Sequence, residues 1–248
     1  MARSIRFFGV AVILLGFATV APAQERIFYI EELLATSAPA GQRAPGGTIK
    51  TWVRGDRMRT ESSSGEIAIY RQDLGLAWLM HAPSKTYVEV GSDKLAQMGM
   101  QSLSVFGRVE NGAFVIPEPL FQPTGKKRDV GAWSCEDHEV AAKQVLGPGI
   151  TSTTTQCVAP KTGLLAADLV HVFRLSVGGA TSATFDKFYA QVQLLPGYPV
   201  EQKTVTNAQG QIVSTTKTLK KVEFPTMNDA LFELPAGFTK IQPPPGLK

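Results

Sequence analysis

Two cysteines, Cys135 and Cys157, constrain the fold of this chain more than any other feature, because the sequence has no others. Each lies in a segment whose residues are typical of a strand, at 132–140 and at 151–158. The Gly-Pro-Gly cluster at 147–149 predicts a turn between these segments. The pattern indicates an antiparallel hairpin, or two nearby strands of one sheet, that a disulfide would join.

The N-terminus has the features of a secretory signal peptide. Arg3 and Arg6 precede a stretch of fourteen uncharged residues, 7–20, and the small-x-small pattern of a cleavage site ends at Ala23. Fourteen residues are too few to cross a bilayer, which needs about 20. We therefore expect cleavage after Ala23, export to the periplasm, and a mature chain that does not span the membrane.

Export decides how the cysteines are interpreted. Disulfides form and persist in oxidising compartments such as the periplasm. A free buried thiol pair and a metal site are the alternatives, but His81, His138 and His171 show no ligand spacing to either cysteine. We predict a disulfide between Cys135 and Cys157 and no metal site.

The charge of the chain argues against a nucleic-acid partner. The sequence has 25 Lys and Arg against 21 Asp and Glu, a net charge of +4. Removal of residues 1–23 takes away two arginines and no acid, which lowers this to +2. The longest basic run, at 126–128, has only three residues, as a solvated turn or strand often does.

The clearest structural signal is a meander of five short strands between residues 49 and 90. Apolar and polar residues alternate from Ile49 to Arg54, and Gly55-Asp56 predicts a two-residue hairpin turn. Further turn clusters separate the remaining strands. The other expected strands are 27–30, for which a helix is the alternative, 113–116, 200–206 and 211–224, with a short one within 228–238. The expected helices are 92–106, 164–176 and 182–194, and Ser182 is expected to cap the last of them. Residues 112–124 otherwise appear irregular because of their prolines.

These elements predict an α+β fold in which an antiparallel sheet carries helices on its open face. The helices are too few to form a core of their own, so we expect one domain over residues 24–240. The signal peptide (1–23) precedes it, and a proline-rich extended tail (241–248) follows it.

Several motifs resemble the DUF4412 family of exported bacterial proteins, which is similar in fold to the outer-membrane lipoprotein carriers (LolA-like). They are the strand Gly131–Glu136, the segment Cys157–Pro160, the turn Leu195–Val200, the ending Leu231–Phe238, and the meander segments Trp78–His81 and Lys85–Glu89. The resemblance spans about residues 25–238. It implies a strongly curved antiparallel half-barrel closed by helices, with an apolar cavity of the kind in which the carriers hold acyl chains.

The sequence carries no motif for catalysis or for a cofactor. It has no Gly-rich phosphate loop, no Gly-x-Ser-x-Gly and no His-Glu-x-x-His. We interpret His81, near Ser84, as a surface residue at a strand end, His138 as part of a solvated strand, and His171 as a partly buried helix residue. The chain is therefore predicted to be non-enzymatic, with no catalytic residue and no cofactor.

Aromatic and sulfur-containing side chains are concentrated between residues 52 and 106. Either they form an ordinary packed core, or part of the set lines a cavity for an acyl chain or another apolar ligand. The candidate cavity residues are Trp52, Trp78, Met80, Tyr87, Met98 and Phe106.

These observations lead to three hypotheses of decreasing weight. The first is a periplasmic protein that binds a lipid, an acyl chain or a lipidated partner such as a lipoprotein. The second is an interaction or sensing module that contacts an envelope protein, with 211–224 as a candidate free strand edge. The third is an envelope enzyme, which would require His81 or His138 in a cleft with a serine or carboxylate at hydrogen-bond distance.

Overall fold

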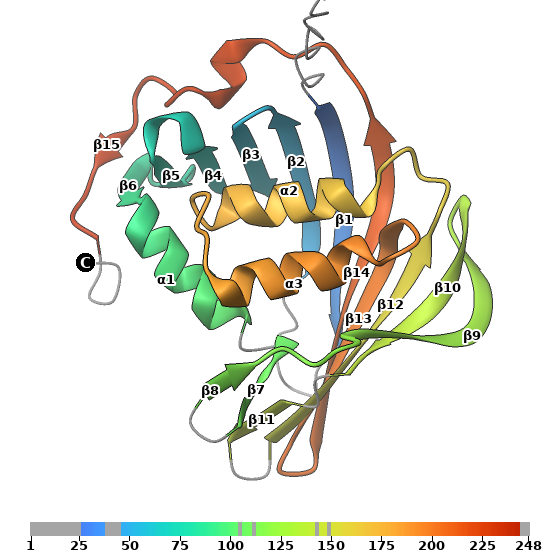
Figure 1. Ribbon diagram of the computed structural model, residues 1–248. Helices are drawn as coiled ribbons and strands as arrows, with labels where there is room; N and C mark the ends of the chain where they lie inside the picture. The colour runs from blue at the N-terminus through green and yellow to red at the C-terminus, as the bar shows by residue number, and fades with distance from the viewer. Residues whose placement is uncertain are drawn as a thin grey trace, which may run out of the picture.

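The computed structural model describes residues 26–37, 46–103, 106–110, 113–141, 144–147 and 150–243. The expected signal peptide and residues 244–248 lie outside these ranges. Within these ranges, thirteen strands form one sheet, in the order β15-β6-β5-β4-β3-β2-β1-β14-β13-β12-β10-β9, with β11 beside β12 (Figure 1). Their bounds are β1 Ile27–Ser37, β2 Gly47–Arg54, β3 Arg57–Ser62, β4 Glu66–Arg71, β5 Leu76–His81, β6 Thr86–Gly91, β9 Phe121–Val130, β10 Trp133–Val140, β11 Gln144–Gly147, β12 Ile150–Ala159, β13 Tyr198–Ala208, β14 Gln211–Glu223 and β15 Thr239–Lys240.

Neighbouring strands pair antiparallel throughout the sheet, except for β15, which pairs parallel with β6. The meander predicted between residues 49 and 90 is confirmed as β2 to β6. Its first turn needs Gly55, which adopts a φ of 51° that side chains disfavour. A separate two-stranded hairpin consists of β7 (Arg108–Glu110) and β8 (Ala113–Val115).

In the described part of the chain, three α-helices lie on one face of the sheet, which we call the helix face (Figure 1). They are α1 (Ser92–Leu103), α2 (Ala166–Ser176) and α3 (Ala183–Gln193). Ser182 caps α3 as predicted, because its hydroxyl accepts a hydrogen bond from the backbone N–H of Phe185 at 3.2 Å. Gly99 allows α1 to approach the segment after α2, since a Cβ there would lie 2.3 Å from Cγ1 of Val177.

The sheet is packed on both faces. On the helix face, Leu164 and Leu175 pack with Phe28, Ile30 and Leu219 of β1 and β14, and a second cluster surrounds α3. On the opposite face, which we call the back face, Phe232 packs with strand residues that include Tyr29 and Ile69. Each face therefore has a core of its own.

The predicted disulfide is confirmed. Cys135 of β10 and Cys157 of β12 are joined, with their Cα atoms 5.4 Å apart. The two strands pair directly and antiparallel, although β11 lies between them in the sequence. Both cysteines are buried, and they pack with Val130 and Tyr198. The bridge therefore stabilises the side of the sheet that ends at β9.

Three expectations about strands are wrong. Residues 112–124 are not irregular throughout, because β9 begins at Phe121; as an edge strand it tolerates Pro123. Residues 228–238 contain no strand, because Asn228 caps the 3-10 helix η3 (Asp229–Phe232), and the last strand, β15, begins later. Residues 211–224 are not a free edge, because β14 lies between β1 and β13. Strong curvature of the sheet stays a prediction.

Candidate functional site

The best candidate site is an open groove of about 470 Å³ on the strands β2 to β6. The strand register shows which face it occupies. Thr60, Ala68, Leu79 and Val88 are direct cross-strand partners and form one row of its floor. Val88 and Leu79 also contact the cluster that contains Leu95 of α1. The groove therefore lies on the helix face, next to the area that α1 covers.

Apart from Thr60, the floor of the groove is apolar. Ile49, Ala68 and Leu79 are only half-buried, although side chains of this type are usually covered in a core. Ile241, beyond β15, closes one side and is exposed. A groove with apolar walls and polar groups restricted to one end is the usual form of a small-molecule site.

The polar groups of the groove gather at the strand ends. Glu66 and His81 are cross-strand partners there, and Ser62 and Thr86 lie beside them. The hydroxyls of Ser62 and Ser64 donate to Oε2 of Glu66 at 2.6 and 2.5 Å, and these hydrogen bonds lower the pKa of that carboxyl. The carboxylate is therefore held in position at the rim.

The structure divides the six predicted cavity residues between the two faces. Four lie together on the back face, where the alternation of β2, β5 and β6 places them: Trp52, Trp78, Met80 and Tyr87. Met98 packs on the helix face against the same cluster as Leu79, and Phe106 packs against Phe188 of α3 with ring centroids 5.0 Å apart. Met80 and Tyr87 border the groove, in the row between its two rows of floor side chains.

An enzyme would require His81 in a cleft with a serine or carboxylate at hydrogen-bond distance, and the pair His81 and Ser84 meets part of this condition. Nδ1 of His81 lies 2.9 Å from the hydroxyl of Ser84, and His81 borders the groove. The same hydroxyl lies 2.7 Å from Oγ1 of Thr86 and donates to the carbonyl oxygen of His81. Hydrogen bonds to neighbours within one turn are typical of a serine that stabilises that turn. We assign the pair a structural role at the rim.

The other two histidines have backbone partners. His138 is buried, not solvated as predicted, and its Nδ1 donates to the carbonyl oxygen of Glu136 at 3.0 Å. His171 is half-buried, as expected for a partly buried helix residue, and its Nε2 donates to the carbonyl oxygen of Gly55 at 2.8 Å. Within the described ranges, no group of three His, Cys, Asp or Glu side chains is arranged to hold a metal ion.

Two further hollows adjoin the β9–β10 hairpin. One, of about 450 Å³, is lined by Trp133, Lys127 and Lys161 next to the disulfide. The other, of about 390 Å³, is lined by Phe121 and Leu194 among others. Both are bordered by Glu136 and Pro196, so they lie side by side along β10.

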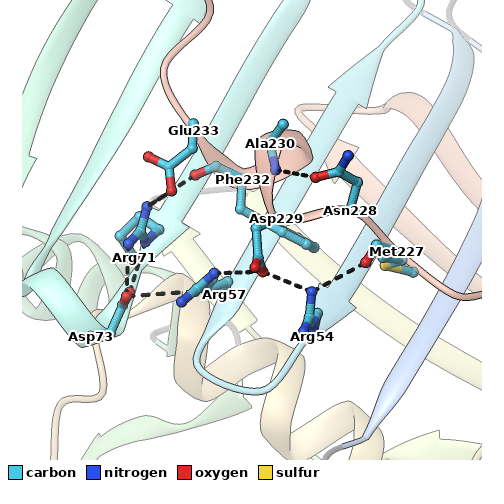
Figure 2. Close-up of polar contacts among 10 residues, drawn as sticks. All are labelled: Arg54, Arg57, Arg71, Asp73, Met227, Asn228, Asp229, Ala230, Phe232 and Glu233. Carbon is cyan, nitrogen blue, oxygen red and sulfur yellow. Dashed lines mark hydrogen bonds and ion pairs between the residues drawn. The ribbon is translucent and has the colours of Figure 1, made fainter.

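The segment 225–241, which we call the C-terminal strap, covers the back face behind the groove. Arg54 and Arg57 donate to Oδ1 of Asp229 at 2.7 and 2.9 Å, and Arg71 donates to Oε1 of Glu233 at 2.7 Å (Figure 2). These arginines project from β2, β3 and β4, and the strap supplies the acids. The strap thereby brings Ile241 to the side of the groove.

Asp73 should make the attachment of the strap sensitive to acid. It accepts two hydrogen bonds from Arg71 at 2.8 Å, which lower the pKa of its carboxyl. A depressed folded-state pKa adds stability above the unfolded pKa of about 3.9, and this is lost as the pH falls through the folded value. Urea unfolding should show that Asp73→Asn is less stable than the parent at pH 7 and that the difference shrinks below about pH 4.

The exposed Asp129 offers a matched control, because Asp129→Asn removes a carboxylate on β9 away from the strap. Its stability should follow the parent at both pH values. A stability difference for Asp73→Asn that stays constant from pH 7 to pH 3 would contradict the acid sensitivity.

Comparisons of the sequence with known proteins found no match. No protein-family model matches the chain, so membership in the DUF4412 family stays a prediction. No curated protein matches it significantly either. No helix among the described residues has the length and apolar character to cross a membrane.

Comparison of the structure found distant similarities. A LolA superfamily protein from Nitrosomonas europaea is 8% identical, with 86% of this chain and 92% of that chain covered and a TM-score of 0.33. A putative outer-membrane lipoprotein-sorting protein domain from Vibrio parahaemolyticus is 9% identical, with 84% and 89% covered and a TM-score of 0.30. PNGF-II is 11% identical, with 86% of this chain and 30% of that chain covered and a TM-score of 0.38.

Proposed function

We propose that this chain is an exported, non-enzymatic protein of the bacterial cell envelope that holds the acyl chain of a lipid or a lipidated partner. The observation that carries the proposal is the groove of about 470 Å³ on the helix face of β2 to β6. Its volume falls within the range of about 300–1,000 Å³ that ligand pockets occupy.

The floor of the groove favours a hydrocarbon. Ile49, Ala68, Leu79 and Val88 offer methyl and methylene groups. The two acids that line the groove, Glu61 and Glu66, lie at or next to the strand ends. Transfer of one methylene group from water into such surroundings is worth about 0.8 kcal/mol.

One further feature supports a location in the cell envelope, and another supports the binding of an apolar ligand. The Cys135–Cys157 disulfide suits an oxidising compartment such as the periplasm. Met98 of α1 packs against the same cluster as Leu79 of the floor, and its flexible side chain adapts to ligands of different shape. Of the predicted cavity residues we include Met98 in the site. Trp52, Trp78, Met80 and Tyr87 pack on the back face and Phe106 packs against α3, so we place these five in packing roles.

Filling the groove should abolish binding of an apolar ligand. In Ala68→Phe, the added ring would occupy the middle of the floor and displace at least two methylene groups, about 1.6 kcal/mol. We expect at least about tenfold weaker binding of the uncharged fluorescent probe N-phenyl-1-naphthylamine. Lipid that is extracted from the purified protein and quantified by mass spectrometry should fall in parallel.

Ala190→Phe is the matched control, because Ala190 is exposed on α3. It should leave probe binding and bound lipid unchanged. If the native protein carries no lipid and Ala68→Phe binds the probe as the parent does, the proposal fails. The interaction module would then be favoured, with the free edge β9 and the hollows beside it as its candidate surface.

A further inference from the structure

The helix face is apolar over the meander but polar further along the sheet, on β12 and β13. Alternate residues of β12 and β13 carry polar side chains that pair across the two strands in register. We call these six side chains the polar array: Ser152, Thr154 and Gln156 of β12, and Thr206, Thr204 and Gln202 of β13. A sheet face that served only as a packed core would carry apolar side chains at these positions.

Packing and register place the polar array on the same face as the groove. Residues two positions apart in a strand point to the same face. Val158 lies two residues beyond Gln156 and packs in the cluster that contains Val192 of α3. Gln202 is the direct partner of Lys217 in β14, and Leu219, two residues further, packs under α2.

The groove and the polar array meet at one ion pair. Glu32 of β1 is the cross-strand partner of Ile49, which lies in the groove floor. Nζ of Lys217 lies 3.2 Å from Oε1 of Glu32, and Lys217 is the cross-strand partner of Gln202 in the array. The apolar and polar areas are therefore contiguous across β1 and β14.

The polar array is only partly satisfied by its own hydrogen bonds. The hydroxyls of Thr154 and Thr204 lie 3.0 Å apart, and those of Ser152 and Thr206 lie 3.2 Å apart. Gln156 is 4% exposed, yet its Oε1 has no hydrogen-bond partner in the described part of the chain. A buried acceptor without a partner costs free energy, which a donor on a ligand would recover.

The charges of this area select the class of ligand. Among the described residues, Lys217 is the cross-strand partner of Gln202 and His138 is that of Gln156, and Glu32 neutralises Lys217. A carboxylate or phosphate is usually bound by charge-assisted hydrogen bonds from arginine or lysine. Hydroxyls and amides instead both donate and accept, which suits an uncharged ligand with many hydroxyl groups.

We propose that the polar array binds the uncharged, hydroxyl-rich head group of an amphiphile, a sugar in chemical class, whose acyl chain lies in the groove. This inference rests on the proposed function of the groove. It adds the chemical class of the head group, and it assigns a role to the buried Gln156, which the groove alone leaves unexplained.

Calorimetric titration with amphiphiles of equal chain length, kept below their micelle concentrations, tests this. We expect dodecyl maltoside to bind at least tenfold more tightly than laurate. Gln156→Leu and Thr204→Val should each weaken maltoside binding at least fivefold and change laurate binding less than twofold. Gln193→Leu, an exposed change on α3, is the matched control and should alter neither ligand.

The thermal stability of Gln156→Leu gives a second readout. Leucine removes an unpartnered buried acceptor at similar volume, so the melting temperature should stay the same or rise. Loss of maltoside binding is then not a loss of folding.

Two failures are distinguishable. Laurate that binds as tightly as the maltoside, or array variants that weaken both ligands equally, would overturn the head-group assignment and leave the groove intact. If neither amphiphile binds the parent, the proposed function itself fails.

Discussion

Replacing Phe232 with alanine should lower the free energy of unfolding by about 3–5 kcal/mol, as is typical of a fully buried phenylalanine. The side chain is 0% exposed and packs with Tyr29, Ile69 and Met80 on the back face. Its loss would leave a cavity between the C-terminal strap and the sheet. The ion pairs of the strap do not compensate, because partly exposed pairs contribute only about 0–1 kcal/mol each.

Urea unfolding measures this change, and hydrogen exchange shows where it acts. The backbone N–H groups of Thr239 and Ile241 donate to the carbonyl oxygens of Lys85 and Tyr87, both at 2.9 Å. These amides should lose protection in Phe232→Ala. Phe224→Ala is the control, because Phe224 is 54% exposed and should cost less than about 1 kcal/mol. A loss of stability below about 1 kcal/mol for Phe232→Ala would show that the strap does not depend on this residue.

Removing the disulfide should cost about 3 kcal/mol, since it closes a loop between residues 22 positions apart. We would compare the parent with the double variant Cys135→Ala, Cys157→Ala. Alanine is preferable to serine because both positions are buried, and a buried hydroxyl would add a cost of its own.

The disulfide prediction has an internal control. Reductant should lower the melting temperature of the parent toward that of the double variant, and it should not affect the double variant. An unchanged melting temperature of the parent under full reduction, confirmed by thiol titration, would contradict a stabilising role for the bridge.

Much of the fold could be predicted because its signals are local. The meander has alternating side chains and tight turns between strands of about six residues, so each pairing depends on neighbours in the sequence. Ser182 as a helix cap and the cysteine pair are likewise local or compositional signals. In contrast, β9 was missed because Pro123 and Gly125 lower its strand propensity, and pairing with β10 overrides that preference.

The candidate site was predicted only in part. Trp52, Trp78, Met80 and Tyr87, four of the six cavity candidates, lie on one side of the meander and pack together on the back face. The groove floor uses the opposite side, with Ala68 and Leu79, which have no unusual chemistry and resemble ordinary core residues. The same alternation could have identified them, because they occupy the complementary positions of the same strands.

The sequence by itself determined which side chains share a face, since the side-chain period of a strand is two and needs no tertiary information. It also determined that Cys135 and Cys157 would pair. Only the tertiary structure decided what covers each face, because the covering elements come from distant parts of the chain. Helices between residues 92 and 193 cover one face, and the C-terminal strap at 225–241 covers the other. The aromatic side of the meander is therefore packed under the strap. The aliphatic side of the meander is only half-covered by helices and forms a groove on the same face as the polar array.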